Sequence, residues 1–164
     1  MASWHEHSEE ELIRIGREAL RSLRFDRAHE VFAEYTERLH GAGRPVPAGV
    51  LANYAVTVGH RKSVKEGLAL CQAALKSDRR APEVYFCLAQ LYLMAKARRK
   101  AWEAIHQGLS FGPRHPGLLG LQAEMGLRKR PVLPFLNRDH AINVRLGRVL
   151  RRIRKRRKGP GDAA

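Results

Sequence analysis

Large and small apolar residues recur along this sequence with a period of about 34 residues. Ala55, Ala89 and Ala123 align at this offset, and Gly67 aligns with Ala101. Small residues are needed where two helices cross closely, because the distance between helix axes follows the side chains at the contact. The period is typical of helix–turn–helix repeats, so the sequence predicts stacked pairs of helices.

Prolines divide the chain into segments that are long enough for such helices. None falls inside 48–81 or 83–112, and both segments are rich in Ala, Leu, Lys and Arg, which favours helix. Gly59 and Gly67 weaken this prediction without overturning it. At Ser8–Glu11, a serine followed by three acids predicts a capping box that starts the first helix.

Composition excludes several classes of protein. The 164 residues carry a net charge of +15 and include two cysteines, too few for a disulfide scaffold or for most cysteine-based zinc sites. The sequence contains no run of about 18 apolar residues, the length needed to span a membrane. The N-terminus lacks the basic start and apolar stretch of a secretory signal. These features predict a cytoplasmic protein, with a peripheral position at the inner membrane surface as the alternative.

The third repeat carries the most specific motif. It contains Pro82-Glu-Val-Tyr-Phe-Cys-Leu-Ala-Gln-Leu-Tyr, then Ala101-Trp-Glu-Ala-Ile, and it ends with Gly108 and Pro113. This segment resembles a tetratricopeptide repeat (TPR), and Phe25–Ala28 resembles the opening of such a repeat's second helix. The resemblance implies an all-α fold, an α-solenoid of three TPR-like helix pairs plus a capping helix, and the sequence adds a C-terminal basic amphipathic helix to this prediction. An unrelated helical bundle with chance periodicity is the alternative.

The resemblance implies a TPR-like domain at residues 8–127, and shorter parts follow it. Pro131 and Pro134 argue against a helix through the next ten residues. Apolar residues at helical spacing from Ile142 to Ile153 then predict an amphipathic helix. The predicted boundaries are units at 9–40, 48–81 and 82–115, a cap at 116–127, a connector at 128–138, the basic helix at 139–158 and a disordered tail at 159–164.

Positive charge is concentrated near the C-terminus. Residues 128–158 contain thirteen Lys/Arg and one acid, whereas residues 1–127 contain eighteen Lys/Arg and fourteen acids. This excess predicts an anion-binding segment, whose candidate partners are a nucleic acid, the ribosome, an anionic membrane or an acidic protein. A solvated tail that only adds solubility is the alternative. The predicted anion-binding residues are Arg148, Arg151, Arg152, Arg154, Lys155, Arg156, Arg157 and Lys158.

The first helices of stacked pairs line a concave groove in solenoids of this kind. The resemblance therefore implies a groove, and the residues expected in it are mostly apolar. An extended or helical peptide with apolar anchors, contributed by a protein partner, would suit such a groove. The predicted groove residues are Ile13, Arg17, Leu20, Ala52, Asn53, Val56, His60, Phe86, Gln90, Leu93, Met94 and Glu124.

The best-known TPR variant grips the acidic C-terminal tail of heat-shock chaperones through a clamp of Lys, Asn and Arg side chains. Asn53 fits one clamp position. Ile13 and Arg17 replace a Lys and an Asn, and Glu83 and Cys87 replace basic residues. We infer from this departure that the clamp is not used. The C-terminal apolar stripe offers two alternatives of its own, since it could plug the groove or cap the last helix of the solenoid.

Motifs for catalysis and metal binding are incomplete. The segment Gly108–Gly112 matches a nucleophile elbow around Ser110, but an elbow needs a preceding strand and a helix end is expected here. His29-Glu30 lacks the second histidine that a zinc-protease helix places one turn later. Cys71 falls on a core position of the repeat and is predicted to be a small buried hydrophobe. The sequence therefore predicts no catalytic residues, no metal site, no cofactor and no enzymatic activity.

The leading functional hypothesis is a non-catalytic, chaperone-like adaptor or scaffold. Its groove would hold an apolar segment of a partner protein, and its basic C-terminal helix would contact an anionic partner. The alternative is an RNA- or ribosome-associated factor, or a peripheral membrane factor, that acts through the basic tail. The sequence leaves the oligomeric state open.

Overall fold

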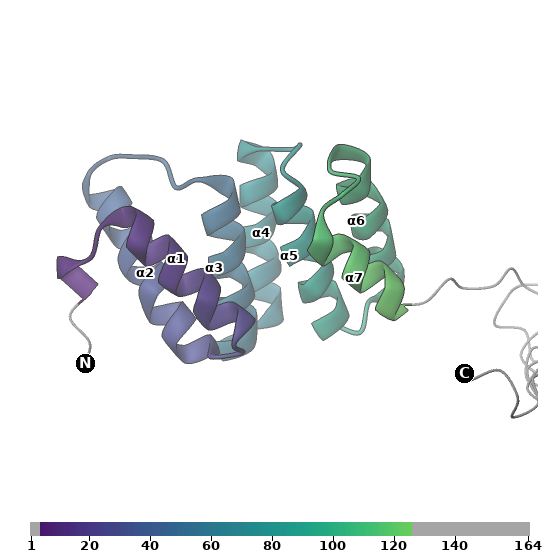
Figure 1. Cartoon of the computed structure of the whole chain (residues 1–164), viewed down its shortest axis with the longest axis horizontal. Helices are drawn as coiled ribbons and strands as arrows, with labels where there is room; N and C mark the ends of the chain where they lie inside the picture. Colours follow the sequence, from purple (N-terminus) through teal and green to yellow (C-terminus); the bar gives the residue numbers. More distant parts are fainter. Residues whose placement is uncertain (1–3, 126–164) are drawn as a thin grey trace, which may run out of the picture. The chain divides into compact units, whose positions relative to one another are not determined.

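A computed structural model describes residues 4–125, which form one short 3-10 helix and seven α-helices without a strand (Figure 1). The predicted connector at 128–138, the basic helix at 139–158 and the tail at 159–164 lie outside the described residues. The helices are η1 (Trp4–Glu6), α1 (Glu9–Arg21), α2 (Phe25–Gly41), α3 (Ala48–Arg61), α4 (Val64–Ser77), α5 (Pro82–Met94), α6 (Arg98–Phe111) and α7 (Pro116–Met125).

The helices stack as successive pairs. Each α-helix packs against the next one along the chain, and α3 also packs against α1 and α5, so the first helices of the pairs lie side by side. The turns that join α1 to α2, α3 to α4 and α5 to α6 lie along one edge of the stack, and the connections between pairs lie along the opposite edge (Figure 1). This arrangement is the all-α solenoid that the repeat predicts.

Side chains and proline mark where several helices begin. Ser8 forms the predicted capping box, because the Glu11 amide donates to Ser8 Oγ (3.3 Å) and the Ser8 amide donates to Glu11 Oε2 (2.9 Å). The hydrogen bond from the Ser8 backbone lowers the pKa of the Glu11 carboxyl. Ser63 Oγ accepts the Lys65 amide at the start of α4 (3.2 Å), and Pro82 is the first residue of α5.

Glycines allow α3 and α4 to cross closely. Gly59 and Gly67 are both buried, and both helices continue through them. A Cβ atom at Gly67 would lie 2.6 Å from the carbonyl oxygen of Ala55 and 3.1 Å from the Cα atom of Gly59. The glycines that weaken the helix prediction are therefore the residues that bring the two backbones together.

Buried side chains form two clusters along the stack. The N-terminal cluster includes Leu12, Phe32 and Leu39, and the larger cluster spans α3 to α7. Cys71 belongs to the larger cluster and is fully buried, as predicted, and burial raises the pKa of its thiol to about 12. The clusters follow the order of the pairs, as expected for a repeat stack in which each unit packs on its neighbours.

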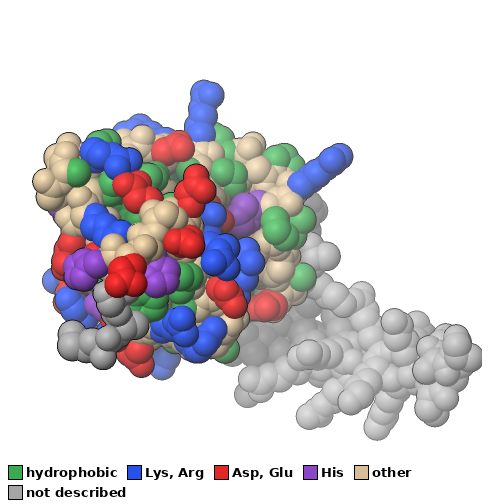
Figure 2. All heavy atoms as spheres, turned by 60° about the vertical axis from the view of Figure 1, so that its left-hand side comes forward, with side chains coloured by type: hydrophobic (Ala, Val, Ile, Leu, Met, Phe, Trp, Pro, Cys, Tyr) green, Lys and Arg blue, Asp and Glu red, His purple; other side chains and the backbone are tan. Residues whose placement is uncertain are grey.

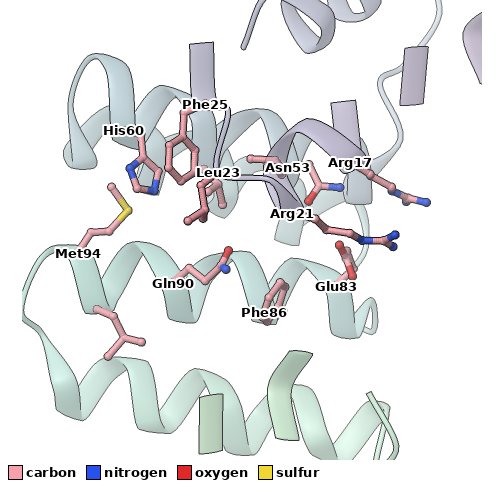
Figure 3. A pocket seen from close by; sticks show the side chains of 13 residues that line it. Arg17, Arg21, Leu23, Phe25, Asn53, His60, Glu83, Phe86, Gln90 and Met94 are labelled. Carbon is pink, nitrogen blue, oxygen red and sulfur yellow. The ribbon is translucent and has the colours of Figure 1, made fainter. Parts of the chain in front are cut away.

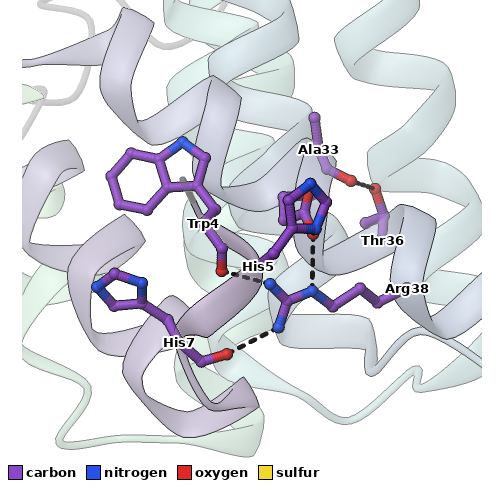
Figure 4. Close-up of polar contacts among 7 residues, drawn as sticks. Trp4, His5, His7, Ala33, Thr36 and Arg38 are labelled. Atoms are coloured by element: carbon purple, nitrogen blue, oxygen red, sulfur yellow. Dashed lines mark hydrogen bonds and ion pairs between the residues drawn. The ribbon is translucent and has the colours of Figure 1, made fainter. Parts of the chain in front are cut away.

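Arg38 holds the N-terminal segment against α2 (Figure 4). Its guanidinium donates to the backbone carbonyl oxygens of Trp4 and His7, the latter at 2.7 Å, and to Glu34 Oε1 at 2.7 Å. His5 Nδ1 lies 3.1 Å from the same Glu34 oxygen. One side chain on α2 thus fixes the path of the chain from η1 into α1.

The surface around the N-terminal pair is mixed in character. Figure 2 shows Lys/Arg and Asp/Glu side chains interspersed over this face, with hydrophobic side chains between them. Among the described residues, no helix combines the length and the apolar character needed to cross a bilayer.

Candidate functional site

A cavity of about 550 Å3 lies between α1, α3 and α5, and the turn from α1 to α2 borders it (Figure 3). Nine of its residues are among those predicted for the groove. The residues that line it are Arg17, Leu20, Arg21, Leu23, Phe25, Asn53, Val56, His60, Glu83, Phe86, Gln90, Leu93 and Met94.

The cavity has a polar end and an apolar end. Arg17, Arg21 and Glu83 lie toward one end, and Leu23, Phe25, His60 and Met94 lie toward the other (Figure 3). Phe86 and Gln90 lie between them along α5 (Figure 3). The gradient gives an extended ligand a preferred direction, because its charged and apolar groups match opposite ends.

Asn53 places an unused hydrogen-bond donor in the cavity wall. Its side chain is 3% exposed, and its Oδ1 accepts from Cys87 Sγ at 3.3 Å. Its Nδ2 has no hydrogen-bond partner among residues 4–125. A buried amide without a partner costs about 1–3 kcal/mol, so a ligand carbonyl or carboxylate that accepts this hydrogen bond would recover that cost.

Phe25 and His60 form a flat platform at the apolar end. Their ring centroids lie 3.5 Å apart with an interplanar angle of 16°. Burial lowers the pKa of the His60 imidazole, which favours its neutral form. This platform joins the start of α2 to the end of α3 and so couples two successive pairs.

His115 connects the cavity wall to α7. Its Nδ1 accepts the Leu118 amide (3.2 Å), so its Nε2 carries the proton in the neutral form and donates to Glu83 Oε2 (3.0 Å). The ring also lies against Phe86, with centroids 5.6 Å apart. His115 therefore caps the start of α7 and orients two cavity residues, Glu83 and Phe86.

Three predicted groove residues do not line the cavity. Ala52 is fully buried in the larger cluster, because it precedes Asn53 by one position on α3 and therefore lies on a different face of the helix. Ile13 packs against the N-terminal cluster. Glu124 is exposed on α7, and the cavity ends at α5. Ala52 thus does not contribute to the cavity wall, although the sequence placed it in the groove.

Four cavity residues were missing from the predicted groove: Arg21, Leu23, Phe25 and Glu83. The first three lie in or directly beside the turn between α1 and α2, whereas the prediction covers only the inner faces of the first helices. The sequence contains one feature that could have identified Leu23: an apolar residue occupies the turn after a helix, where glycine is preferred.

Leu23 has the backbone conformation that favours glycine. Its φ is 57°, and its side chain is 72% exposed. Lys96 occupies the same place after α5 with the same φ of 57°. In both turns, the next residue donates its amide back into the last helical turn, Arg24 to the Ala19 oxygen and Ala97 to the Tyr92 oxygen. An exposed leucine is therefore held in a strained conformation at the rim of the cavity.

We expect Leu23→Gly to raise the free energy of unfolding by about 1 kcal/mol, because glycine adopts this conformation without steric cost. Lys96→Gly is the matched control outside the cavity and should give a similar gain. Urea denaturation followed by circular dichroism measures both. A loss of stability in Leu23→Gly alone would show that packing of the leucine outweighs the backbone strain.

Acidification should destabilise the fold through two histidines. Burial is the main cause that lowers the pKa of His29, with Arg61 and Lys62 adding to it, and burial also lowers the pKa of His60. The unfolded chain binds these protons near pH 6.5, so the free energy of unfolding falls as the pH drops through about 6.5. Urea midpoints at about pH 7.5 and 5.5 test this. The variant His29→Gln/His60→Gln should show a smaller difference, and an equal difference would contradict the prediction.

The candidate catalytic groups have structural roles. Ser110 does not follow a strand, as a nucleophile elbow requires, but lies in the last turn of α6. Its hydroxyl donates to the backbone oxygen of Gln107 (2.7 Å). Burial raises the pKa of the Cys87 thiol well above its usual range. No group of three or more His, Cys, Asp and Glu side chains able to hold a metal ion occurs within the described part. The predicted anion-binding residues, Arg148 to Lys158, lie outside it.

Comparison with known proteins places the fold. No protein-family model and no curated protein matches this sequence. The Arabidopsis OM64 TPR domain is 15% identical with a TM-score of 0.54, and the match covers 71% of this chain and 93% of that domain. The second TPR domain of human RPAP3, solved in complex with the HSP70 peptide SGPTIEEVD, is 13% identical with a TM-score of 0.51, covering 74% and 100%. The chain thus has a TPR-like α-solenoid fold, as predicted.

Proposed function

We propose that this TPR-like chain is a non-catalytic adaptor that holds an apolar segment of a partner protein in the cavity between α1, α3 and α5. The cavity is the observation that carries this proposal. Its volume of about 550 Å3 lies within the range of ligand sites. Its lining combines apolar side chains from three helices with the unpartnered amide of Asn53. Apolar anchors with a few placed polar groups are what peptide recognition requires.

The polar groups of the cavity indicate which segment would bind. The RPAP3 domain was solved with a peptide that carries several acidic residues. In this chain the cavity wall contains the carboxylate of Glu83, which accepts a hydrogen bond from His115. Cys87, which donates to Asn53, is buried and carries no positive charge. Arg17 and Arg21 lie at the same end as Glu83, whose carboxylate partly neutralises their positive charge. We therefore expect the apolar end, rather than acidic residues of the partner, to select the segment.

A peptide library displayed on phage tests this proposal with the full chain as the target. Selected peptides should share at least two apolar anchors. Their affinity should fall about tenfold or more for Leu93→Asp, because a charge is introduced among the apolar side chains that line the cavity. Leu23→Gly should weaken binding without loss of stability, which separates recognition from folding.

Leu119→Asp is the matched control, since Leu119 is 42% exposed on α7 and does not line the cavity. Circular dichroism establishes that each variant is folded. Peptides that bind Leu93→Asp as tightly as the original chain would refute the proposal, as would a selected consensus without apolar anchors.

The basic run at residues 148–158 would supply a second, electrostatic contact. It contains eight Lys/Arg among eleven residues. Deletion of 151–164 should leave the affinity for cavity peptides unchanged and reduce binding to a polyanion such as heparin, with a strong dependence on salt. A change in peptide affinity would instead support the alternative that this segment plugs the cavity.

A further inference from the structure

Basic residues within the helical stack are concentrated at one edge. We define the basic edge as the three turns within pairs, from the last residue of the first helix to the third residue of the second: 21–27, 61–66 and 94–100. These segments contain ten Lys/Arg and two acids, whereas the rest of residues 4–125 contains eight Lys/Arg and twelve acids. The basic residues of the edge are Arg21, Arg24, Arg27, Arg61, Lys62, Lys65, Lys96, Arg98, Arg99 and Lys100.

The fold brings these three segments together. The turns within pairs lie along the same edge of the stack in Figure 1. The same definition applied to the connections between pairs gives 41–50, 77–84 and 111–118, which contain four Lys/Arg and two acids. The charge is thus a property of one edge, and it would not be expected from the composition of the stack as a whole.

The charges at the basic edge are mostly without partners. All ten basic residues are exposed. Arg61 pairs with Asp26 and Arg99 pairs with Glu103, each at 3.0 Å, and the other eight form no ion pair within the described residues. Like charges gathered along one edge repel one another, so a bound polyanion would stabilise the edge.

Aromatic side chains lie among these basic residues. Phe25 stacks on His60, and the Tyr92 ring lies 5.9 Å from Lys100 Nζ. Trp102, partly exposed near the start of α6, lies 4.6 Å from the His106 ring between centroids. Basic residues that follow a backbone, together with aromatic rings on which bases stack, are the combination that binds single-stranded nucleic acids. A membrane surface or an acidic protein would need the charge but not the rings.

We propose that the basic edge binds single-stranded nucleic acid. The Arg and Lys side chains contact successive phosphates, and Tyr92 and Trp102 provide stacking surfaces for bases. This activity goes beyond the adaptor function, because it uses the turns within pairs rather than the cavity, although Arg21 and Phe25 border both. It also uses other residues than the C-terminal basic run.

Binding of a fluorescently labelled oligo(U) of about 20 nucleotides to the full chain, measured by anisotropy, tests the proposal. The edge variant is Arg24→Glu/Lys62→Glu/Arg98→Glu. The control variant, Arg79→Glu/Arg80→Glu/Arg114→Glu, makes the same change in net charge at the opposite edge and leaves the C-terminal run intact. The edge variant should lose about tenfold or more in affinity, and its salt slope should fall by about 2, since each phosphate contact contributes about 0.7. The control should lose less than about threefold.

Trp102→Leu should weaken binding about fivefold or more, because base stacking on an aromatic ring is lost. Phe111→Leu is its control, since Phe111 ends α6 at the opposite edge. Equal losses in the edge and control variants would overturn the proposal, and so would an edge variant that weakens binding to phosphatidylserine vesicles while oligo(U) binding is unchanged. If the Glu variants unfold, Arg24→Gln/Lys62→Gln/Arg98→Gln tests the same contacts.

Discussion

Replacement of Gly67 by alanine should lower the free energy of unfolding by roughly 3 kcal/mol, at the upper end of the usual cost of overpacking a core. The added Cβ atom would lie 2.6 Å from the Ala55 carbonyl oxygen and 2.9 Å from Leu91 Cδ2. Leu91 can adjust, but the carbonyl oxygen belongs to the backbone of α3, so α3 and α4 would have to separate. Thermal unfolding followed by circular dichroism should show a fall of roughly 10 °C in Tm.

Gly120→Ala is the matched control, because a Cβ atom at this position of α7 would have nothing within 4 Å. Alanine is the better helix former by up to about 1 kcal/mol, so this variant should be slightly more stable than the original chain. An unchanged Tm for Gly67→Ala would show that α3 and α4 are not packed as closely as described.

Phe32→Ala should be equally damaging and should act on one part of the stack. Phe32 is fully buried in the N-terminal cluster, and its ring occupies the space that the missing side chain of Gly16 leaves open. Loss of a buried phenylalanine costs about 3–5 kcal/mol. Because stability in a repeat stack is a sum of local terms, we expect α1 and α2 to open while α3 to α6 stay folded.

Hydrogen exchange measured by mass spectrometry distinguishes local opening from global unfolding. Peptides from α1 and α2 should lose protection in Phe32→Ala, and peptides from α5 and α6 should keep it. Phe111→Ala is the control, since Phe111 is 42% exposed at the end of α6, and it should cost far less. Uniform loss of protection across the chain would contradict the local model.

The fold was predictable because the spacing of small and large apolar residues in the repeat reflects which side chains pack between the helices. Ala55 aligns with Ala89, and Ala101 aligns with Gly67. The three alanines are small because each lies fully buried where helices meet. The capping box at Ser8 was equally readable, since it depends on residues only three positions apart. Gly67 was readable only in part: its alignment with Ala101 indicated a close helix crossing, but only the distance between the two backbones shows that even a Cβ atom does not fit there.

The cavity was predictable where a single helix decides the side chain's direction. Val56 and His60 follow Asn53 by three and seven positions and share its face, and all three line the cavity. Leu23 and Phe25 reach the cavity from the turn between α1 and α2. The path of that turn depends on how two helices pack, and the periodicity of one helix does not describe it. Ala52 does not line the cavity, since a shift of one position along α3 moves a side chain from the cavity wall into the core.

The contacts of Arg38 bear on which substitutions the N-terminal segment should tolerate over evolutionary time. Its guanidinium binds carbonyl oxygens of Trp4 and His7, which every amino acid possesses. Exchange of the side chain at His7 therefore leaves that contact intact, whereas lysine at position 38 would lose the planar fork that reaches several acceptors at once. Among descendants of this sequence, drift should be freer at position 7 than at position 38.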